Sequence, residues 1–172
     1  MIQYNLKAPD CLRATVTLPA SKSISNRVSI LGALATEAAP LHNLADSDDG
    51  CALQRALTSD DETIDIGAAG TAMRFLTAYF AARPGRTRLL TGSDRMRQRP
   101  IGLLVDALRT LGADIAYTER EGYPPLRIVG RRLRGGEVTM DSGVSSQFLS
   151  ALLMVAPTME RGLRLRLTGA TV

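Results

Sequence analysis

The chain has 172 residues, of which 45% are hydrophobic and 22% charged, so it suits one globular domain and is too apolar for a disordered chain. Its net charge of +4 comes from 21 basic and 17 acidic residues, which are interleaved, and aromatic residues make up only 4%. Nucleic-acid-binding proteins usually show a basic stripe and stacking aromatic residues, so this composition argues against a nucleic-acid partner.

Signals for membrane targeting and for metal binding are also missing from the sequence. Residues 1–7 lack the apolar stretch of a signal peptide, and the longest apolar segment, residues 148–157, is too short to span a bilayer. The two cysteines, Cys11 and Cys51, and the single histidine, His42, do not have the number or spacing of a zinc site. We therefore expect a cytoplasmic protein that uses no metal and no other cofactor.

Helix and strand signals alternate along the chain, with turn signals between them. We expect helices over residues 22–36, 49–58, 70–82, 100–112 and 145–156. We expect strands over residues 13–18, 40–44, 62–66, 87–91, 113–118, 126–129, 137–140 and 163–168. This alternation is typical of an α/β domain.

Two of these helices are apolar on most sides. Residues 148–156 are apolar at nearly every position, and residues 28–35 are so less completely. A helix of this kind lies in the middle of a structure. Strands such as residues 15–18 and 163–167 instead alternate apolar and polar residues, which indicates one solvated face. The sequence predicts buried helices with sheets outside them.

The segment that opens the first helix, residues 18–27 (LPASKSISNR), has the residue types of an anion-binding site. Serine hydroxyls and free N–H groups at a helix start can point at a bound anion, and the helix dipole favours its charge. Lys22 adds a point charge and Arg27 a fork of donors. A serine-rich cap on an ordinary amphipathic helix would show the same pattern, so the motif alone leaves both interpretations open.

Two later helices open in a similar way. Residues 66–74 (IGAAGTAMR) place Gly70 in a strand-to-helix turn, where glycine permits close backbone approach to a ligand. At the last helix, Ser145, Ser146 and Gln147 offer two hydroxyls and an amide, which suit phosphate and carboxylate or polyol groups. Repeated units would bring these helix starts to one place. Each motif taken alone is equally explained as a tight turn or a serine cap.

A basic segment follows the strand at residues 87–91. It carries Arg95, Arg97 and Arg99, and arginine forks bind carboxylates and phosphates well. The usual interpretation of such a run is a solvated loop, to which we assign Arg97 and Arg99. The acidic residues of segment 46–49 receive a structural role, because acids at a helix start complement the dipole.

Taken together and in this order, the motifs resemble those of the EPSP synthases, the 3-phosphoshikimate 1-carboxyvinyltransferase family. The matching segments are residues 21–27 (SKSISNR), 69–74 (AGTAMR), 90–92 with 95–96 and 99–101, and 144–148 (VSSQF). The resemblance implies a shikimate-pathway transferase, which serves the synthesis of chorismate and aromatic amino acids. It moves the enolpyruvyl group of phosphoenolpyruvate to the 5-hydroxyl of shikimate 3-phosphate and releases phosphate.

The resemblance also implies a fold and a set of site residues. The fold is an α/β, inside-out domain of repeated βαβαββ units, one of two domains in a monomeric enzyme. Shikimate 3-phosphate would be bound by Lys22, Ser23, Arg27, Ser145, Ser146 and Gln147. Phosphoenolpyruvate would be surrounded by Lys22, Gly70, Arg95 and Gln147, with Lys22 as the catalytic residue.

The chain departs from this family in length. Family members are much longer, and their proton-transferring carboxylates lie in the second domain. Residues 19–172 would form most of the N-terminal, substrate-binding domain, residues 1–18 would pass through the second domain, and the C-terminal domain is absent. We expect the isolated chain to be inactive. Two alternatives stay open: a carboxyvinyltransferase acting on a UDP-amino sugar, and a non-catalytic module that binds a phosphorylated metabolite.

Overall fold

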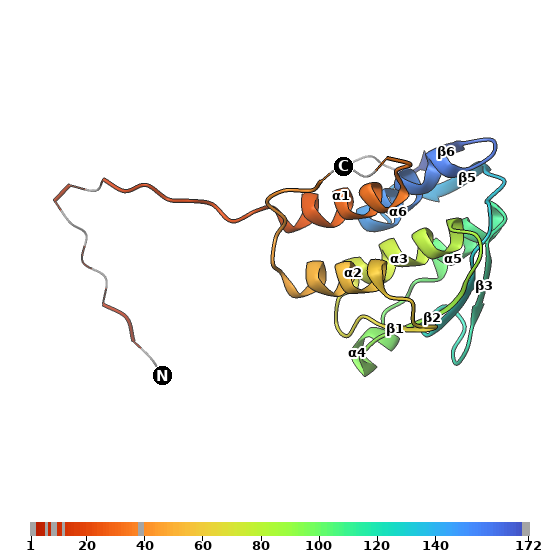
Figure 1. The fold of residues 1–172 in the computed structure, drawn as a ribbon, viewed down its shortest axis with the longest axis horizontal. Helices are drawn as coiled ribbons and strands as arrows, with labels where there is room; N and C mark the ends of the chain where they lie inside the picture. Colours follow the sequence, from red (N-terminus) through yellow and green to blue (C-terminus); the bar gives the residue numbers. More distant parts are fainter. Residues whose placement is uncertain (1–2, 6, 8–9, 12, 38–39, 170–172) are drawn as a thin grey trace.

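The computed structural model describes residues 3–5, 7, 10–11, 13–37 and 40–169 of the chain. Its helices are α1 (Lys22–Leu34), α2 (Asp48–Thr58), α3 (Gly70–Ala82), α4 (Asp94–Arg97), α5 (Gly102–Thr110), α6 (Ser146–Val155) and the 3-10 helix η1 (Ala156–Thr158). Its strands are β1 (Thr63–Asp65), β2 (Thr87–Thr91), β3 (Asp114–Tyr117), β4 (Leu126–Val129), β5 (Gly136–Asp141) and β6 (Leu163–Thr168). Figure 1 shows the helices gathered in the middle, with the sheets along the outside.

Helix α3 lies at the centre of the fold. Every residue in it except Thr71 is buried, and Phe75 and Leu76 are fully so. It packs against α1, α2, α5 and α6 and against strands β2 and β4 (Figure 1). The predicted arrangement of buried helices is therefore confirmed, but the central helix is not one of the two that the sequence indicated.

The correction concerns α1 in particular. We expected residues 28–35 to be buried on most sides, yet α1 is only half covered, and its Ile24 and Leu31 are 63% and 46% exposed. Helix α6 is closer to the expectation, although Leu153 is exposed. An apolar run in the sequence thus predicts that a helix contacts the core. Which helix lies at the centre depends on how many other elements pack against it.

Strands β1 to β4 form a sheet in the order β1-β2-β4-β3. Strand β1 pairs parallel to β2, and β4 pairs antiparallel to both β2 and β3. In chain order β1, α3, β2, α5, β3 and β4 make one complete βαβαββ unit, with the short α4 inserted after β2. Leu90, Leu126 and Ile128 on the inner face of the sheet are fully buried, so the sheet covers the helices from one side.

Strands β5 and β6 form a separate parallel pair, with α6 between them in the chain. Val138 and Met140 are buried on the inner face. On the outer face Glu137 pairs with Arg164 at 3.6 Å and with Arg166 at 3.3 Å. This alternation confirms the solvated outer face that the sequence predicted for residues 163–167.

Two expected strands are not formed. Residues 13–18 run as an irregular extended segment that leaves the body of the molecule (Figure 1), with Val16 73% and Leu18 79% exposed. Residues 40–44, including the exposed His42, are also irregular, and Asn43 has a φ of 53°. A strand needs a partner for its N–H and C=O groups, and neither segment has one among the described residues. In the part of the chain that is described, no helix is long and apolar enough to cross a membrane.

The turns that follow β1 and β2 pack closely against each other at Gly92. A Cβ at this position would lie 2.5 Å from the Gly67 carbonyl oxygen and 3.0 Å from the Met96 side chain. Because a backbone carbonyl cannot rotate away, we expect Gly92→Ala to lower the free energy of unfolding by about 1–3 kcal/mol, measured by urea denaturation.

Gly32→Ala is the matched control. Its Cβ would meet only the flexible Leu41 side chain, at 3.3 Å, and alanine favours the helix in which residue 32 lies. We expect a change within about 1 kcal/mol. Equal losses in the two variants would show that the Gly67–Gly92 contact is not special.

Candidate functional site

The starts of α1, α3 and α6 meet in the structure. Gln147 at the start of α6 donates from Nε2 to Oγ1 of Thr71 at the start of α3, at 3.3 Å. Arg27 of α1 donates from Nη2 to Oγ of Ser150 in α6, at 2.9 Å, and its guanidinium lies 5.4 Å from the ring centroid of Phe75 in α3. The expected meeting of helix starts is confirmed, and we call this region the helix-start site.

Arg27 is held in one place within this site. Its Nη1 donates to Oγ of Ser23 at 2.5 Å and to the Ser23 carbonyl oxygen at 2.9 Å. Together with Ser150 and the Phe75 ring, these contacts fix both the position and the plane of the guanidinium. A guanidinium fixed in this way loses little side-chain entropy when it binds an anion.

Lys22, the first residue of α1, rests on an acid of α2. Its Nζ lies 2.9 Å from Oδ2 of Asp49, and the Asp49 side chain is only 14% exposed. Both residues line a cavity of about 730 Å³, whose opposite wall is the turn at residues 66–69. From the sequence we expected Asp49 only to complement the dipole of its helix. The structure adds a second role, because Asp49 also positions the Lys22 ammonium.

Two arginines converge on the start of α3. Arg74 is 6% exposed, and its Nη1 donates to the Gly70 carbonyl oxygen at 2.9 Å and contacts the sulfur of Met96 at 3.9 Å. A Cβ at Gly70 would collide with the guanidinium of Arg99 and lie 3.2 Å from Arg74 Nη1. The absence of a side chain at Gly70 therefore lets both guanidiniums lie close to the start of α3.

No acid neutralises these two cations within the described residues: neither Arg74 nor Arg99 forms an ion pair there. Burial, and after it the charge of Arg99, lowers the pKa of Arg74 to about 10, and the charge of Asp49 opposes this only in part. The N-cap residue of α3, Ala69, has no side-chain cap either, so the first N–H groups of the helix lack that partner. Positive charge and free N–H groups thus gather where an anion would be stabilised.

Helix α4 brings a further arginine to this region. Arg95 and Arg99 line one cavity of about 430 Å³, together with Ser93 and Ala68. Arg97 points elsewhere, since it pairs with Glu119 at 3.2 Å and donates to the Gly92 carbonyl oxygen. Arg99 is exposed in the loop after α4, as expected, but its guanidinium lies over Gly70, a contact that the sequence did not predict. No spacing along the chain indicates this contact, because α4 ends at Arg97 and the position of Arg99 depends on the fold.

The serines of α6 have a structural function as well. Ser145 is the N-cap, and its Oγ accepts a hydrogen bond from the Gln147 N–H at 3.4 Å. Ser146, the first residue of the helix, is exposed at the same end. Among the described residues, no cluster of three or more histidines, cysteines or acids is suited to hold a metal ion. The helix-start site is therefore a cluster of cations, hydroxyls and N–H groups.

This arrangement can be compared with known proteins. The sequence matches the family model for EPSP synthase (3-phosphoshikimate 1-carboxyvinyltransferase) over residues 6–59 and 50–172. The chain belongs to the EPSP synthase family. The segments that carried the resemblance lie at the starts of α1, α3 and α6 and in the stretch that runs from the end of β2 through α4 to the start of α5.

Individual relatives extend this result. A 3-phosphoshikimate 1-carboxyvinyltransferase of Bacteroides fragilis (strain YCH46) is 56% identical over 171 residues, which cover 99% of this chain and 42% of the relative. One from Pseudoalteromonas translucida is 41% identical and covers 100% of this chain and 46% of the relative. The solved EPSP synthase of Acinetobacter baumannii shares the fold, with a TM-score of 0.73 at 24% identity over 84% of this chain and 38% of that one. The chain spans less than half the length of these relatives.

Arg74 offers a test of whether the helix-start site carries an unneutralised charge. We expect Arg74→Met to leave the free energy of unfolding unchanged or to raise it, because methionine removes a buried charge that has no acidic partner. Thermal and urea unfolding measure this directly.

Arg88→Met is the matched control. The Gly70 carbonyl oxygen that Arg74 contacts still accepts a backbone N–H within α3. Arg88 is equally buried, but it donates to the carbonyl oxygens of Ser59 and Asp61, which lie outside any helix. Those acceptors would lose their donor, so we expect a loss of about 1–3 kcal/mol. A similar loss in Arg74→Met would mean that Arg74 stabilises the fold and is not kept for an anion.

Proposed function

We propose that this chain forms the shikimate 3-phosphate half-site of an EPSP synthase. The enzyme transfers the enolpyruvyl group of phosphoenolpyruvate to the 5-hydroxyl of shikimate 3-phosphate and releases phosphate. Both substrates are small phosphorylated carboxylates, so their site must offer several cations close together. The observation that carries the proposal is the convergence of Lys22, Arg27, Arg74 and Arg99 on three helix starts in a member of this family.

Shikimate 3-phosphate would occupy the side of the site between α1 and α6. Arg27, fixed by Ser23 and Ser150, would donate a pair of hydrogen bonds to an anionic oxygen. Ser145 and Ser146 would bind the phosphate at the start of α6, where the helix dipole also favours it. Gln147, already held toward Thr71, would lie against the ring of the substrate.

Phosphoenolpyruvate would lie between α3 and α4. The absence of a side chain at Gly70 permits close approach to the first N–H groups of α3, where the Arg99 guanidinium lies, and Arg95 lines the same cavity as Arg99. Lys22 would contact both substrates and act as the catalytic residue of this half. Its ammonium would stabilise the charge that develops as phosphate leaves.

The reaction is an addition followed by an elimination. The 5-hydroxyl oxygen adds to the phosphate-bearing carbon of the enol phosphate and loses its proton, while the terminal CH2 carbon gains a proton and becomes a methyl group. The tetrahedral intermediate then loses phosphate and one proton of that methyl group, which restores the double bond as the enolpyruvyl ether. The residues of the helix-start site mainly position charge, so the proton transfers are assigned to acids of the second domain.

The same proposal gives the chain a domain organisation. We infer that residues 19–172 form most of the N-terminal domain and that residues 1–18 pass through the second domain of a monomeric, cytoplasmic enzyme. The extended segment supports this inference, because Val16 and Leu18 are apolar and nearly uncovered by the rest of the described chain (Figure 1). Apolar side chains in such a segment are expected to be covered by another part of the enzyme.

Calorimetric titration with shikimate 3-phosphate tests the half-site. We expect saturable binding that Arg27→Ala and Ser145→Ala each weaken by about tenfold or more, since each removes a hydrogen bond to a charged group. Arg164→Ala is the control, because Arg164 is 79% exposed and pairs only with Glu137. UDP-N-acetylglucosamine should not compete.

The same samples report on activity. With both substrates present we expect no release of phosphate from this chain alone. Competition by UDP-N-acetylglucosamine would favour the related UDP-amino-sugar transferases. Binding that Arg27→Ala and Ser145→Ala leave unchanged would reject the helix-start site as the binding site, and enzymatic turnover would reject the assignment of proton transfer to a second domain.

A further inference from the structure

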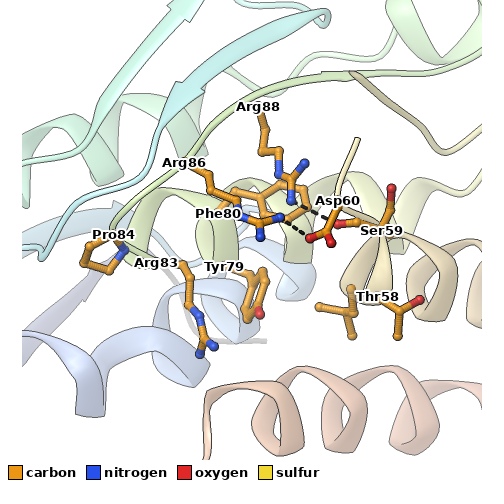
Figure 2. Close-up of a pocket in the computed structure, with 11 residues that line it drawn as sticks. Thr58, Ser59, Asp60, Tyr79, Phe80, Arg83, Pro84, Arg86 and Arg88 are labelled. Carbon is orange, nitrogen blue, oxygen red and sulfur yellow. Dashed lines mark hydrogen bonds and ion pairs between the residues drawn. The ribbon is translucent and has the colours of Figure 1, made fainter. Parts of the chain in front are cut away.

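A second cavity, of about 370 Å³, lies at the other ends of α2 and α3 and is called the rear cavity here. Tyr79 and Phe80, near the end of α3, form its floor, and Arg83, Arg86 and Arg88 stand around them (Figure 2). Tyr79 lies nine residues after Gly70 in α3, so about 14 Å of helix separates this cavity from the helix-start site. Its volume lies within the range of small-molecule sites, about 300–1,000 Å³.

One of the three arginines, Arg88, is held in place by the protein and forms part of the cavity wall. Arg88 is 6% exposed and donates from Nη2 to the Ser59 carbonyl oxygen at 2.9 Å and from Nη1 to that of Asp61. Its guanidinium also lies 5.8 Å from the ring centroid of Phe80. These contacts use its donors to hold the segment after α2, so Arg88 shapes the cavity rather than binding a ligand.

Arg83 and Arg86 are exposed and have unused donors. Arg83 donates from Nη1 to the Ala33 carbonyl oxygen at 3.0 Å and lies 6.0 Å from the Tyr79 ring. Arg86 reaches only the carboxylate of Asp60. A guanidinium has five N–H donors, so within the described chain most donors of both side chains have no protein acceptor. Figure 2 shows the two guanidiniums on either side of Tyr79.

The contact of Asp60 indicates that the cavity binds carboxylate groups. Its carboxylate is held by Arg86 across 26 positions of the chain, although the Asp60 side chain is 85% exposed. The hydrogen bond and the charge of Arg86 lower the pKa of Asp60. Exposed pairs of this kind are weakly held, so a free carboxylate can take the place of Asp60. Three arginines face one acid here, which leaves the lining positively charged.

We propose that the rear cavity is a second binding site, for a small organic dicarboxylate. One carboxylate replaces Asp60 on Arg86, the second binds Arg83, and the short carbon chain between them crosses the Tyr79 ring. Two separate exposed guanidiniums favour a ligand with two anionic ends over a single ion. The polar rim of Thr58 and Ser59 favours a short, hydrated ligand over a large apolar one.

Titration of the chain with succinate, followed by two-dimensional ¹H–¹⁵N NMR, tests the proposal. We expect saturable shifts of the backbone and arginine side-chain signals at residues 58–60 and 79–88. Arg83→Ala and Arg86→Ala should each weaken succinate about tenfold, the loss expected for one charge-assisted pair. Acetate, which has one carboxylate, should bind at least about tenfold more weakly than succinate for the same reason.

Asp60→Asn gives the sharpest result, because it removes the internal competitor and keeps the size of the side chain. We expect it to tighten succinate binding several-fold. Asp114→Asn is the matched control: Asp114 forms an exposed pair with Arg131 outside the cavity, and its loss should change nothing. The proposal is overturned if Asp60→Asn leaves succinate binding unchanged or weakens it, if Asp114→Asn has the same effect, or if inorganic phosphate binds there as tightly as succinate. Shifts confined to the starts of α1, α3 and α6 would overturn it too, and would assign succinate to the helix-start site.

Discussion

The burial of α3 is the constraint on which the rest of the structure depends. This helix is surrounded by four others and by the sheet, so its position constrains how each of them packs. Its start meets the start of α6 through Thr71 and Gln147, and Gly70 beside them leaves space that the guanidiniums of Arg99 and Arg74 occupy. The same burial takes Arg74 out of water without an ion pair among the described residues, and this lowers its pKa although the charge of Asp49 acts in the opposite direction. The packing of α3 thus determines both the core and the position of the helix-start site.

The sequence predicted the regular elements well where their signals are local. Residues 70–82, 87–91, 126–129 and 163–168 form the expected elements with the expected bounds, because each lies between clear turn residues. The expected strands at residues 13–18 and 40–44 failed, because a strand depends on a partner that a local pattern does not reveal. The central helix was misjudged for the same reason. Helix α3 contains Arg74 and Thr77, so it looked less apolar than α6, yet its neighbours enclose it more completely.

The site shows a similar division. Lys22, Ser23, Arg27 and the segment 145–147 stand in short motifs at helix starts, so the sequence could identify them as candidates. The structure joins Arg27 to Ser23 and to Ser150 of α6, and Gln147 to Thr71 of α3, while Lys22 pairs with an acid of α2. Asp49 and Arg99 contribute to the site through contacts with other elements. Asp49 pairs with Lys22, and Arg99 lies against the start of α3. No spacing along the chain reveals a contact between Asp49 and Lys22, because it depends on how α1 packs on α2. The residue types at the helix starts therefore predicted a site for anions. The distribution of charges around that site could be seen only in the folded structure.

The two ends of α3 show why the placement of arginine is informative. The carbonyl end of a helix is negative, so arginine there is favourable without any ligand. Arg83 and Arg88 fit this pattern, since both donate to backbone carbonyl oxygens near helix ends. The N-terminal end is positive, so Arg74 and Arg99 oppose the dipole and each other there. Selection for stability alone would place acids at that end. An anion bound in the site that we propose at this end would supply the missing negative charge, and it would account for arginines in this position.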